Sequence, residues 1–252
     1  MTRWKLTIEY DGSAFFGWQK QAEDISVQQI LEEAIEKFSS EKIRLFVAGR
    51  TDTGVHARAQ IAHFDLQKEY DAIEIQGAIN FHIKEHRISI ISAEIVPDNF
   101  HARFDALSRT YRYLIINRRP TLALNKGKAW HFPRPLELAP MQEAAALLIG
   151  DHDFSTFRAH HCQAKSPIKT MEAIDISQTG ELFIFNVRAR SFLYHQVRNI
   201  VGSLSLVGAG KWSVDDFNTA FQAADRTKGG PTAPAEGLYF WEVVYPENEN
   251  KN

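Results

Sequence analysis

The stretch Ala48-Gly49-Arg50-Thr51-Asp52-Thr53-Gly54-Val55-His56-Ala57 sets one carboxylate, that of Asp52, among glycines, threonines, an arginine and a histidine. Apolar runs at residues 43–47 and 57–66 flank it, which predicts a tight polar turn between two strands. The two glycines allow backbone angles and close approaches that a side chain would block. Asp, Thr and Gly are also ordinary turn residues. These ten residues alone therefore favour a structural and a functional role for Asp52 about equally.

Basic residues are segregated along the chain. The 252 residues include 29 Lys and Arg against 31 Asp and Glu, a net charge of −2. Residues 103–134 nevertheless hold eight bases and one acid, with Tyr and Trp interleaved, whereas residues 65–98 hold seven acids and three bases. A segregated basic segment can bind a polyanion such as RNA on one face. The alternative is a solvated strand edge, because Lys and Arg also protect exposed edges.

Composition points to an ordinary soluble globular protein, with 44% hydrophobic and 24% charged residues. No apolar run is long enough to span a bilayer and the N-terminus lacks an apolar signal core, so we expect a cytoplasmic protein without a membrane partner. Cys162 is the single cysteine, which excludes an internal disulfide and a Cys-based zinc motif. The adjacent His160-His161-Cys162 is expected to be loop rather than a metal site.

Helical and strand patterns alternate in two similar halves. Strands are expected at residues 3–10, 43–47, 57–66, 87–96, 107–117, 168–177, 181–190 and 238–245. Helices are expected at residues 26–38, 71–82, 138–149, 194–207 and 213–224, with Ser26, Asp71 and Ser213 as N-caps. This predicts an α+β protein of two ferredoxin-like, RNA-recognition-like halves, whose mainly antiparallel sheets join into one central sheet flanked by helices. The expected domains are residues 1–105 and 106–246, followed by a flexible tail at 247–252.

Several further blocks occur in a fixed order over nearly the whole chain. They are Tyr10-Asp11-Gly12, Phe16-Gly17-Trp18-Gln19, the stretch around Asp52, Asn99-Phe100-His101-Ala102-Arg103-Phe104, Ser108-Arg109-Thr110-Tyr111-Arg112-Tyr113, His152-Asp153-Phe154, Val197-Arg198-Asn199-Ile200-Val201-Gly202, and Ala233-Pro234-Ala235 with Gly237-Leu238. Together these blocks resemble the bacterial tRNA pseudouridine synthase A family. The least similar stretch is residues 158–169.

The resemblance implies a pseudouridine synthase fold and an isomerase that converts uridine to pseudouridine at positions 38, 39 and 40 of the tRNA anticodon stem-loop. It implies no cofactor and no metal, and a homodimer as the working unit. Asp52 would be the nucleophile, or the base of a route through a glycal, and Arg198 its catalytic partner. Tyr111 would stack on the target base, and Arg50, Arg109 and Leu238 would also contact the substrate.

Elementary electrostatics agrees with these assignments. Burial alone would raise the pKa of Asp52 and neutralise it, so an ionised Asp52 in a dry pocket needs a cation such as Arg198. Spacing alone would assign Tyr111 to cross-strand packing. Two other classes of function remain open: a non-catalytic RNA-binding or RNA-chaperone protein of the same fold, and an Asp-dependent hydrolase, which would require a second carboxylate or a metal.

Overall fold

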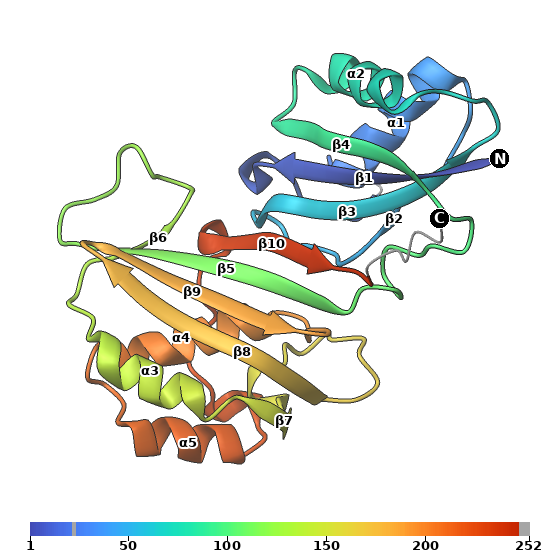
Figure 1. Cartoon of the computed structure of the whole chain (residues 1–252). Helices are drawn as coiled ribbons and strands as arrows, with labels where there is room; N and C mark the ends of the chain where they lie inside the picture. Colours follow the sequence, from blue (N-terminus) through green and yellow to red (C-terminus); the bar gives the residue numbers. More distant parts are fainter. Residues whose placement is uncertain (22–23, 247–252) are drawn as a thin grey trace. The chain divides into compact units, whose positions relative to one another are not determined.

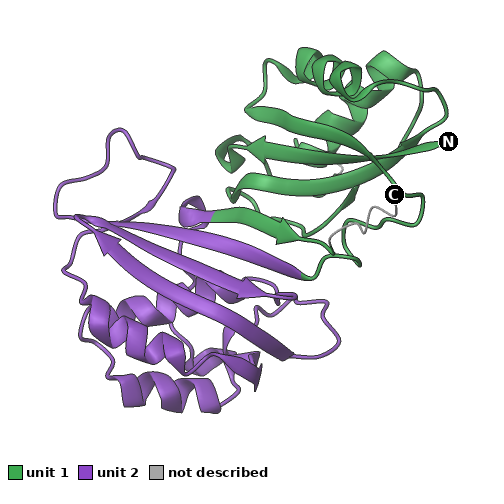
Figure 2. Cartoon of the chain, viewed as in Figure 1, with its two compact units in different colours: residues 1–107, 239–252 green, residues 108–238 purple. Residues whose placement is uncertain are grey.

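The computed structural model describes residues 1–21 and 24–246, and the chain divides into two compact units (Figure 2). The first unit contains residues 1–107 together with the C-terminal strand from residue 239, and the second contains residues 108–238. The sequence placed that last strand in the second half. It belongs to the first because it pairs in parallel with the strand that follows the Asp52 turn, Tyr239 lying opposite His56. The tail expected at 247–252 lies outside the described residues.

The first unit is a sheet with two helices on one face (Figure 1). Its strands follow the order β4-β1-β3-β10, and β2 pairs with β3. The strands are β1 (Thr2–Tyr10), β2 (Phe46–Val47), β3 (His56–Leu66), β4 (Ile88–Val96) and β10 (Leu238–Val244), and the helices are α1 (Val27–Ser39) and α2 (Ala72–Ile83), with a short 3-10 turn η1 (Gly12–Ala14). β1 is paired antiparallel with β3 on one side and with β4 on the other. Alternate side chains along β1 therefore face the core of this unit.

Local sequence signals explain these elements. Trp4, Leu6 and Ile8 alternate along β1 and are fully buried. The Ser26 hydroxyl accepts the Gln29 N–H at the start of α1. Asp71 begins α2 with a complete capping box. Of the expected strand 43–47, only Phe46–Val47 pairs with β3.

The second unit is an antiparallel sheet with three α-helices (Figure 1). Its strands follow the order β5-β9-β8-β7, and β6 pairs in parallel with β5. They are β5 (Ser108–Asn117), β6 (Trp130–Phe132), β7 (Gly150–Asp153), β8 (Ile168–Thr179) and β9 (Leu182–Ala189); the helices are α3 (Leu138–Ala146), α4 (Gln196–Gly208) and α5 (Val214–Gln222), with 3-10 turns η2 (Ser155–Phe157), η3 (Arg226–Lys228) and η4 (Ala235–Gly237). The sequence did not predict β6 or β7.

Helix α4 is buried along most of its length, with Val197, Ile200, Val201 and Leu204 in the core. The helix ends in a glycine-containing C-terminal cap. Gly210 has a positive φ of 67°, and its N–H donates to the Val207 carbonyl at 2.9 Å. The predicted fold class, a mixed α+β protein of mainly antiparallel strands flanked by helices, is confirmed. Within residues 1–21 and 24–246, no helix has the length and apolarity needed to cross a bilayer.

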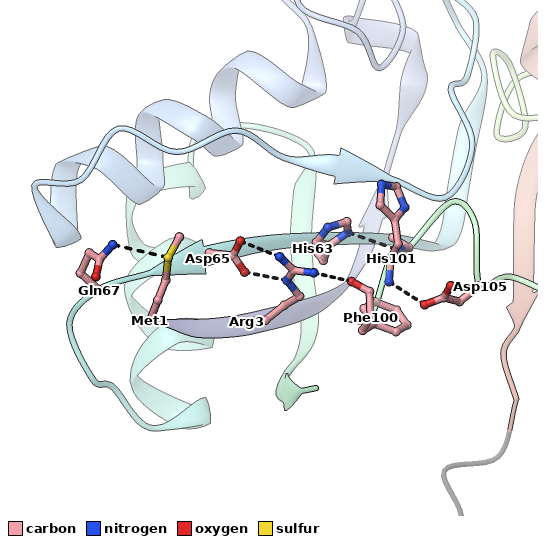
Figure 3. A network of polar contacts seen from close by, with 9 residues as sticks. Met1, Arg3, His63, Asp65, Gln67, Phe100, His101 and Asp105 are labelled. Atoms are coloured by element: carbon pink, nitrogen blue, oxygen red, sulfur yellow. Dashed lines mark hydrogen bonds and ion pairs between the residues drawn. The ribbon is translucent and has the colours of Figure 1, made fainter. Parts of the chain in front are cut away.

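A polar network fastens the loop after β4 to the sheet face of the first unit (Figure 3). Arg3 donates to both carboxylate oxygens of Asp65, at 2.7 and 2.8 Å, and to the Phe100 carbonyl at 2.9 Å. The Ala102 N–H donates to Nδ1 of His63 at 3.1 Å. Burial, together with the charges of neighbouring His101 and Arg3, lowers the pKa of His63 to about 4. His63 must therefore be neutral to hold the loop.

We expect the free energy of unfolding to fall as the pH drops from 6.5 toward 4. The unfolded chain binds a proton on His63 near its usual pKa of 6.5, whereas the folded protein binds it only near 4. The stability contributed by neutral His63 is therefore complete above 6.5 and lost toward 4, a change of at most about 3 kcal/mol. Denaturant unfolding across this range measures it. His63→Gln keeps an acceptor but does not titrate, so equal pH slopes for variant and wild type would contradict the assignment.

Candidate active site

The turn that carries Asp52 is held by the loop that follows β1. The Trp18 N–H donates to the Thr51 carbonyl at 3.0 Å, and the Gly54 N–H donates to the Phe15 carbonyl at 3.4 Å. Within the turn, the Val55 N–H donates to the Asp52 carbonyl at 3.1 Å. The backbone on both sides of Asp52 is thus tied to one neighbouring loop.

Side chains of β1 and β3 also form hydrogen bonds to this turn. The Tyr10 and Thr51 hydroxyls lie 2.7 Å apart, and the buried Gln60 amide donates to the Gly49 carbonyl at 2.7 Å. Burial, together with the charge of Asp52, raises the pKa of Tyr10 to about 12. Tyr10 is therefore a neutral phenol throughout the physiological range.

Two glycines permit this close approach of loop and turn. A Cβ at Gly12 would lie 2.0 Å from the Val55 carbonyl oxygen, and one at Gly17 would lie 2.7 Å from the Thr51 carbonyl oxygen. Gly17 also has a φ of +85°, which strains any L side chain. Because the opposing atoms belong to the backbone, a larger residue at either position must displace the turn. We call this arrangement the glycine clamp. It comprises the close contacts at Gly12 and Gly17 and the two backbone hydrogen bonds that Phe15 and Trp18 form with the turn.

His56, which follows the Asp52 turn, is 1% exposed. Its Nδ1 accepts the Gly12 N–H at 3.0 Å, and its ring stacks on Tyr239 at 4.6 Å. Trp18 is likewise 1% exposed and packs near the Tyr10 ring, so it belongs to the core instead of reaching solvent. Phe16 is half exposed.

Arg50 is exposed on the Asp52 turn, and Asp52 itself is partly buried. Both residues belong to the first unit, whereas Tyr111, Arg109 and Arg198 belong to the second. The expected site residues are therefore distributed over both units. No group of three His, Cys, Asp or Glu side chains in the described ranges is arranged to hold a metal ion.

Tyr111 lies on β5, opposite Val187 of β9, and its ring is partly exposed. It meets Phe192 edge to face, with ring centroids 5.0 Å apart and planes at 88°. Two residues along the same strand, buried Tyr113 donates its hydroxyl to the Pro234 carbonyl at 2.7 Å. Phe192 therefore fixes the orientation of the Tyr111 ring while leaving part of it accessible.

Arg198 extends from the first turn of α4 and is partly buried. Its Nε donates to the Ala233 carbonyl at 2.8 Å, and the Ala233 N–H donates back to the Arg198 carbonyl at 3.1 Å. Its Nη1 lies 3.3 Å from Nε2 of His195. A guanidinium can only donate, so this imidazole nitrogen is the acceptor. The charged head of Arg198 is thus held at two points.

The other expected substrate contacts are buried. Arg109 is 8% exposed and donates to the Arg190 carbonyl at 2.5 Å, and Leu238 is 5% exposed. No sequence pattern predicted a role for His195, whose φ of +60° places the N-cap of α4 in the left-handed region. Such strain in a residue other than glycine occurs preferentially at functional sites.

The chain is similar to known proteins over nearly its whole length. A profile described as tRNA pseudouridine synthase matches residues 6–105 and 144–246. The chain is 53% identical over 245 residues to tRNA pseudouridine synthase A of Rhodospirillum centenum, covering 97% of this chain and all of that protein. It is 51% identical to the enzyme of the same name from Paramagnetospirillum magneticum, covering all of this chain and 98% of that protein. A solved Cbf5-Nop10-Gar1 complex gives a TM-score of 0.37 at 9% identity, over 80% of this chain and 44% of that one, which is too low to support a conclusion.

Proposed function

We propose a position specificity and a set of catalytic roles for this chain, which belongs to the tRNA pseudouridine synthase family. The chain is an isomerase that converts uridine to pseudouridine in tRNA. Our proposal adds that the uridines are those at positions 38, 39 and 40 of the anticodon stem-loop. It also adds that Asp52 attacks or deprotonates the substrate, that Arg198 keeps Asp52 ionised, and that the protein works as a cytoplasmic homodimer.

The reaction needs a group that assists cleavage of the N-glycosidic bond and survives unchanged. The bond between N1 and C1′ breaks, the uracil turns, a bond forms between C5 and C1′, and the C5 proton is lost while N1 gains one. Atoms and electrons balance without an external reactant. An ionised carboxylate can add to a carbon of the sugar or base, or remove a ribose proton in a glycal route. Asp52 suits each of these roles because the glycine clamp fixes its backbone.

Arg198 is the proposed cation because its guanidinium is restrained and permanently charged. The Ala233 carbonyl and Nε2 of His195 are both neutral acceptors, so neither neutralises its charge. A cation near a partly buried carboxylate lowers the pKa of that carboxylate and opposes the effect of burial. Arg198 would thus keep Asp52 anionic at neutral pH.

Tyr111 is proposed as the platform for the target uracil. Target nucleotides must leave the stack before their glycosidic bonds can be reached, and an aromatic ring replaces the lost stacking. The edge-to-face contact with Phe192 leaves Tyr111 oriented and partly exposed, as this role requires. We propose that exposed Arg50 binds the phosphate backbone, and that Arg109 and Leu238 shape the pocket from buried positions.

Purified wild-type protein is expected to form pseudouridine at positions 38–40 of an unmodified tRNA transcript without added metal or nucleotide. Asp52→Asn should abolish product, by more than about 10⁴-fold, because an amide is neither a nucleophile nor a base. Its affinity for tRNA should change little. Nucleotide-resolution mapping of pseudouridine and filter binding measure the two effects, with Asp151→Asn in β7 as the control.

Each arm of that experiment can fail separately. Product at other uridines would reject the position specificity while leaving the isomerase intact. Full activity of Asp52→Asn would reject the role of Asp52. Wild-type binding with no product at any uridine would favour a non-catalytic RNA-binding or RNA-chaperone protein.

Arg198→Lys should lower the single-turnover rate by about 100-fold or more, with tRNA affinity within a few-fold of wild type. Lysine keeps the charge but lacks the planar fork that reaches Ala233 and His195 together. As the pH is lowered, the rate of the variant should begin to fall at a higher pH than the rate of the wild type. The reason is that the misplaced lysine lowers the pKa of Asp52 less than Arg198 does. Equal pH profiles would contradict the pairing of Arg198 with Asp52.

A further inference from the structure

An open pocket of about 280 Å³ lies in the second unit at the edge formed by β6. Its lining consists of Trp130, His131, Phe132, Pro133 and Arg134, together with Lys211 just after α4. Trp130 and Phe132 meet edge to face, with ring centroids 5.1 Å apart, and both rings are partly exposed. The pocket thus combines two aromatic rings with two cations, and its lining contains no acid.

The walls of the pocket are fixed by one side chain of β5. The Asn117 amide nitrogen donates to the Phe132 carbonyl at 2.8 Å and to the Arg134 carbonyl at 2.5 Å, and its amide oxygen accepts the Leu136 N–H at 3.1 Å. Within the same segment, Nε2 of His131 lies 2.9 Å from the carbonyl oxygen of Arg118, just after β5. The segment is therefore held in place before any ligand arrives, which limits the entropy lost on binding.

Its two cations have no carboxylate partner among the described residues. Arg134 and Lys211 are both exposed and take part in no ion pair within residues 1–21 and 24–246. Glu137 is the nearest acid in sequence; its N–H donates to the Gly208 carbonyl, and its side chain pairs with neither cation. Exposed, unpaired cations are the groups that neutralise phosphates and release counterions on RNA binding.

The pocket also lies on the same face of β5 as Tyr111. Trp130 is opposite Ile115, and its ring meets the Tyr113 ring edge to face at 6.2 Å. Tyr111, Tyr113 and Ile115 alternate along one strand and so share a face, on which Tyr113 and Ile115 are fully buried. Ile115 is four positions along β5 from Tyr111, about 13 Å at ~3.3 Å per residue.

We propose that this pocket binds a second nucleotide of the tRNA substrate, outside the position that receives the target uridine. Its base lies against Trp130 and Phe132, and its phosphate is bound by Arg134 and Lys211. Stacking on aromatic rings tolerates every base, so the pocket anchors the RNA without selecting its sequence. The inference rests on the proposed function only in taking tRNA as the ligand. It assigns a role to Arg134 of the basic segment at residues 103–134, whose bases contribute only Arg109 to the proposed site of the target uridine.

The test separates charge from stacking. Arg134→Ala/Lys211→Ala should raise the Kd for full-length tRNA about tenfold and reduce the slope of log K against log salt by about 2, since two phosphate contacts are lost. Phe132→Leu should raise the Kd several-fold with the slope unchanged, and Phe132→Tyr should restore binding. Lys37→Ala/Lys42→Ala removes two exposed charges from the first unit as the matched control. The rate at saturating tRNA should stay at the wild-type value in every variant.

Thermal unfolding verifies that each variant is folded. Unchanged Kd and salt slope in the charge variant would overturn the proposal, as would a Phe132→Leu variant that binds like wild type. A change in sedimentation without a change in tRNA affinity would mean that the pocket faces a second copy of the chain, which also overturns it. Wild-type protein that binds tRNA but forms no pseudouridine would reject the proposed function alone, because the Kd series is read without turnover.

Discussion

The close contact between the loop after β1 and the Asp52 turn is the constraint on which the rest of the first unit depends. Two backbones approach at Gly12 and Gly17 to distances that no Cβ can occupy. The turn cannot move as a hinge, because Trp18 and Gly54 supply hydrogen bonds on both sides of Asp52. A catalytic group must be held within a fraction of an ångström, and a turn hydrogen-bonded to the neighbouring loop holds it through its backbone.

The second unit solves the same problem by different means. There a helix rather than a turn carries the proposed catalytic residue. Helix α4 is anchored by apolar residues such as Ile200 and Leu204, so its first turn is a rigid base for Arg198. The guanidinium is then fixed by a backbone carbonyl and a neutral imidazole. These two contacts orient the guanidinium at the start of the helix.

Regular elements could be read from the sequence wherever one face is apolar. The alternation of Trp4, Leu6 and Ile8 predicts β1, and the capping boxes beginning at Asp71 and Ser213 predict α2 and α5. β7 escaped prediction because its residues are Gly, Asp, His and Asp, without an apolar face. β6 is only three residues long and lies within a basic loop, so its pairing with β5 has no local signal. The return of β10 to the first unit depends on long-range pairing that composition does not encode.

The proposed catalytic residues could be identified from the sequence because the resemblance to a family rests on residue types at matching positions. The residues that hold them in place could not be identified in this way. Nothing local in the sequence says that Gly17 faces a carbonyl or that His195 faces a guanidinium, since each contact joins residues whose neighbourhood is set by packing.

The most direct measurement is the single-turnover rate of Gly17→Ala, with Gly180→Ala as control; Gly180 also has a positive φ but faces open space. The clamp predicts a rate about 100-fold lower for Gly17→Ala at unchanged tRNA affinity, and little change for Gly180→Ala. Equal rates in the two folded variants would contradict it.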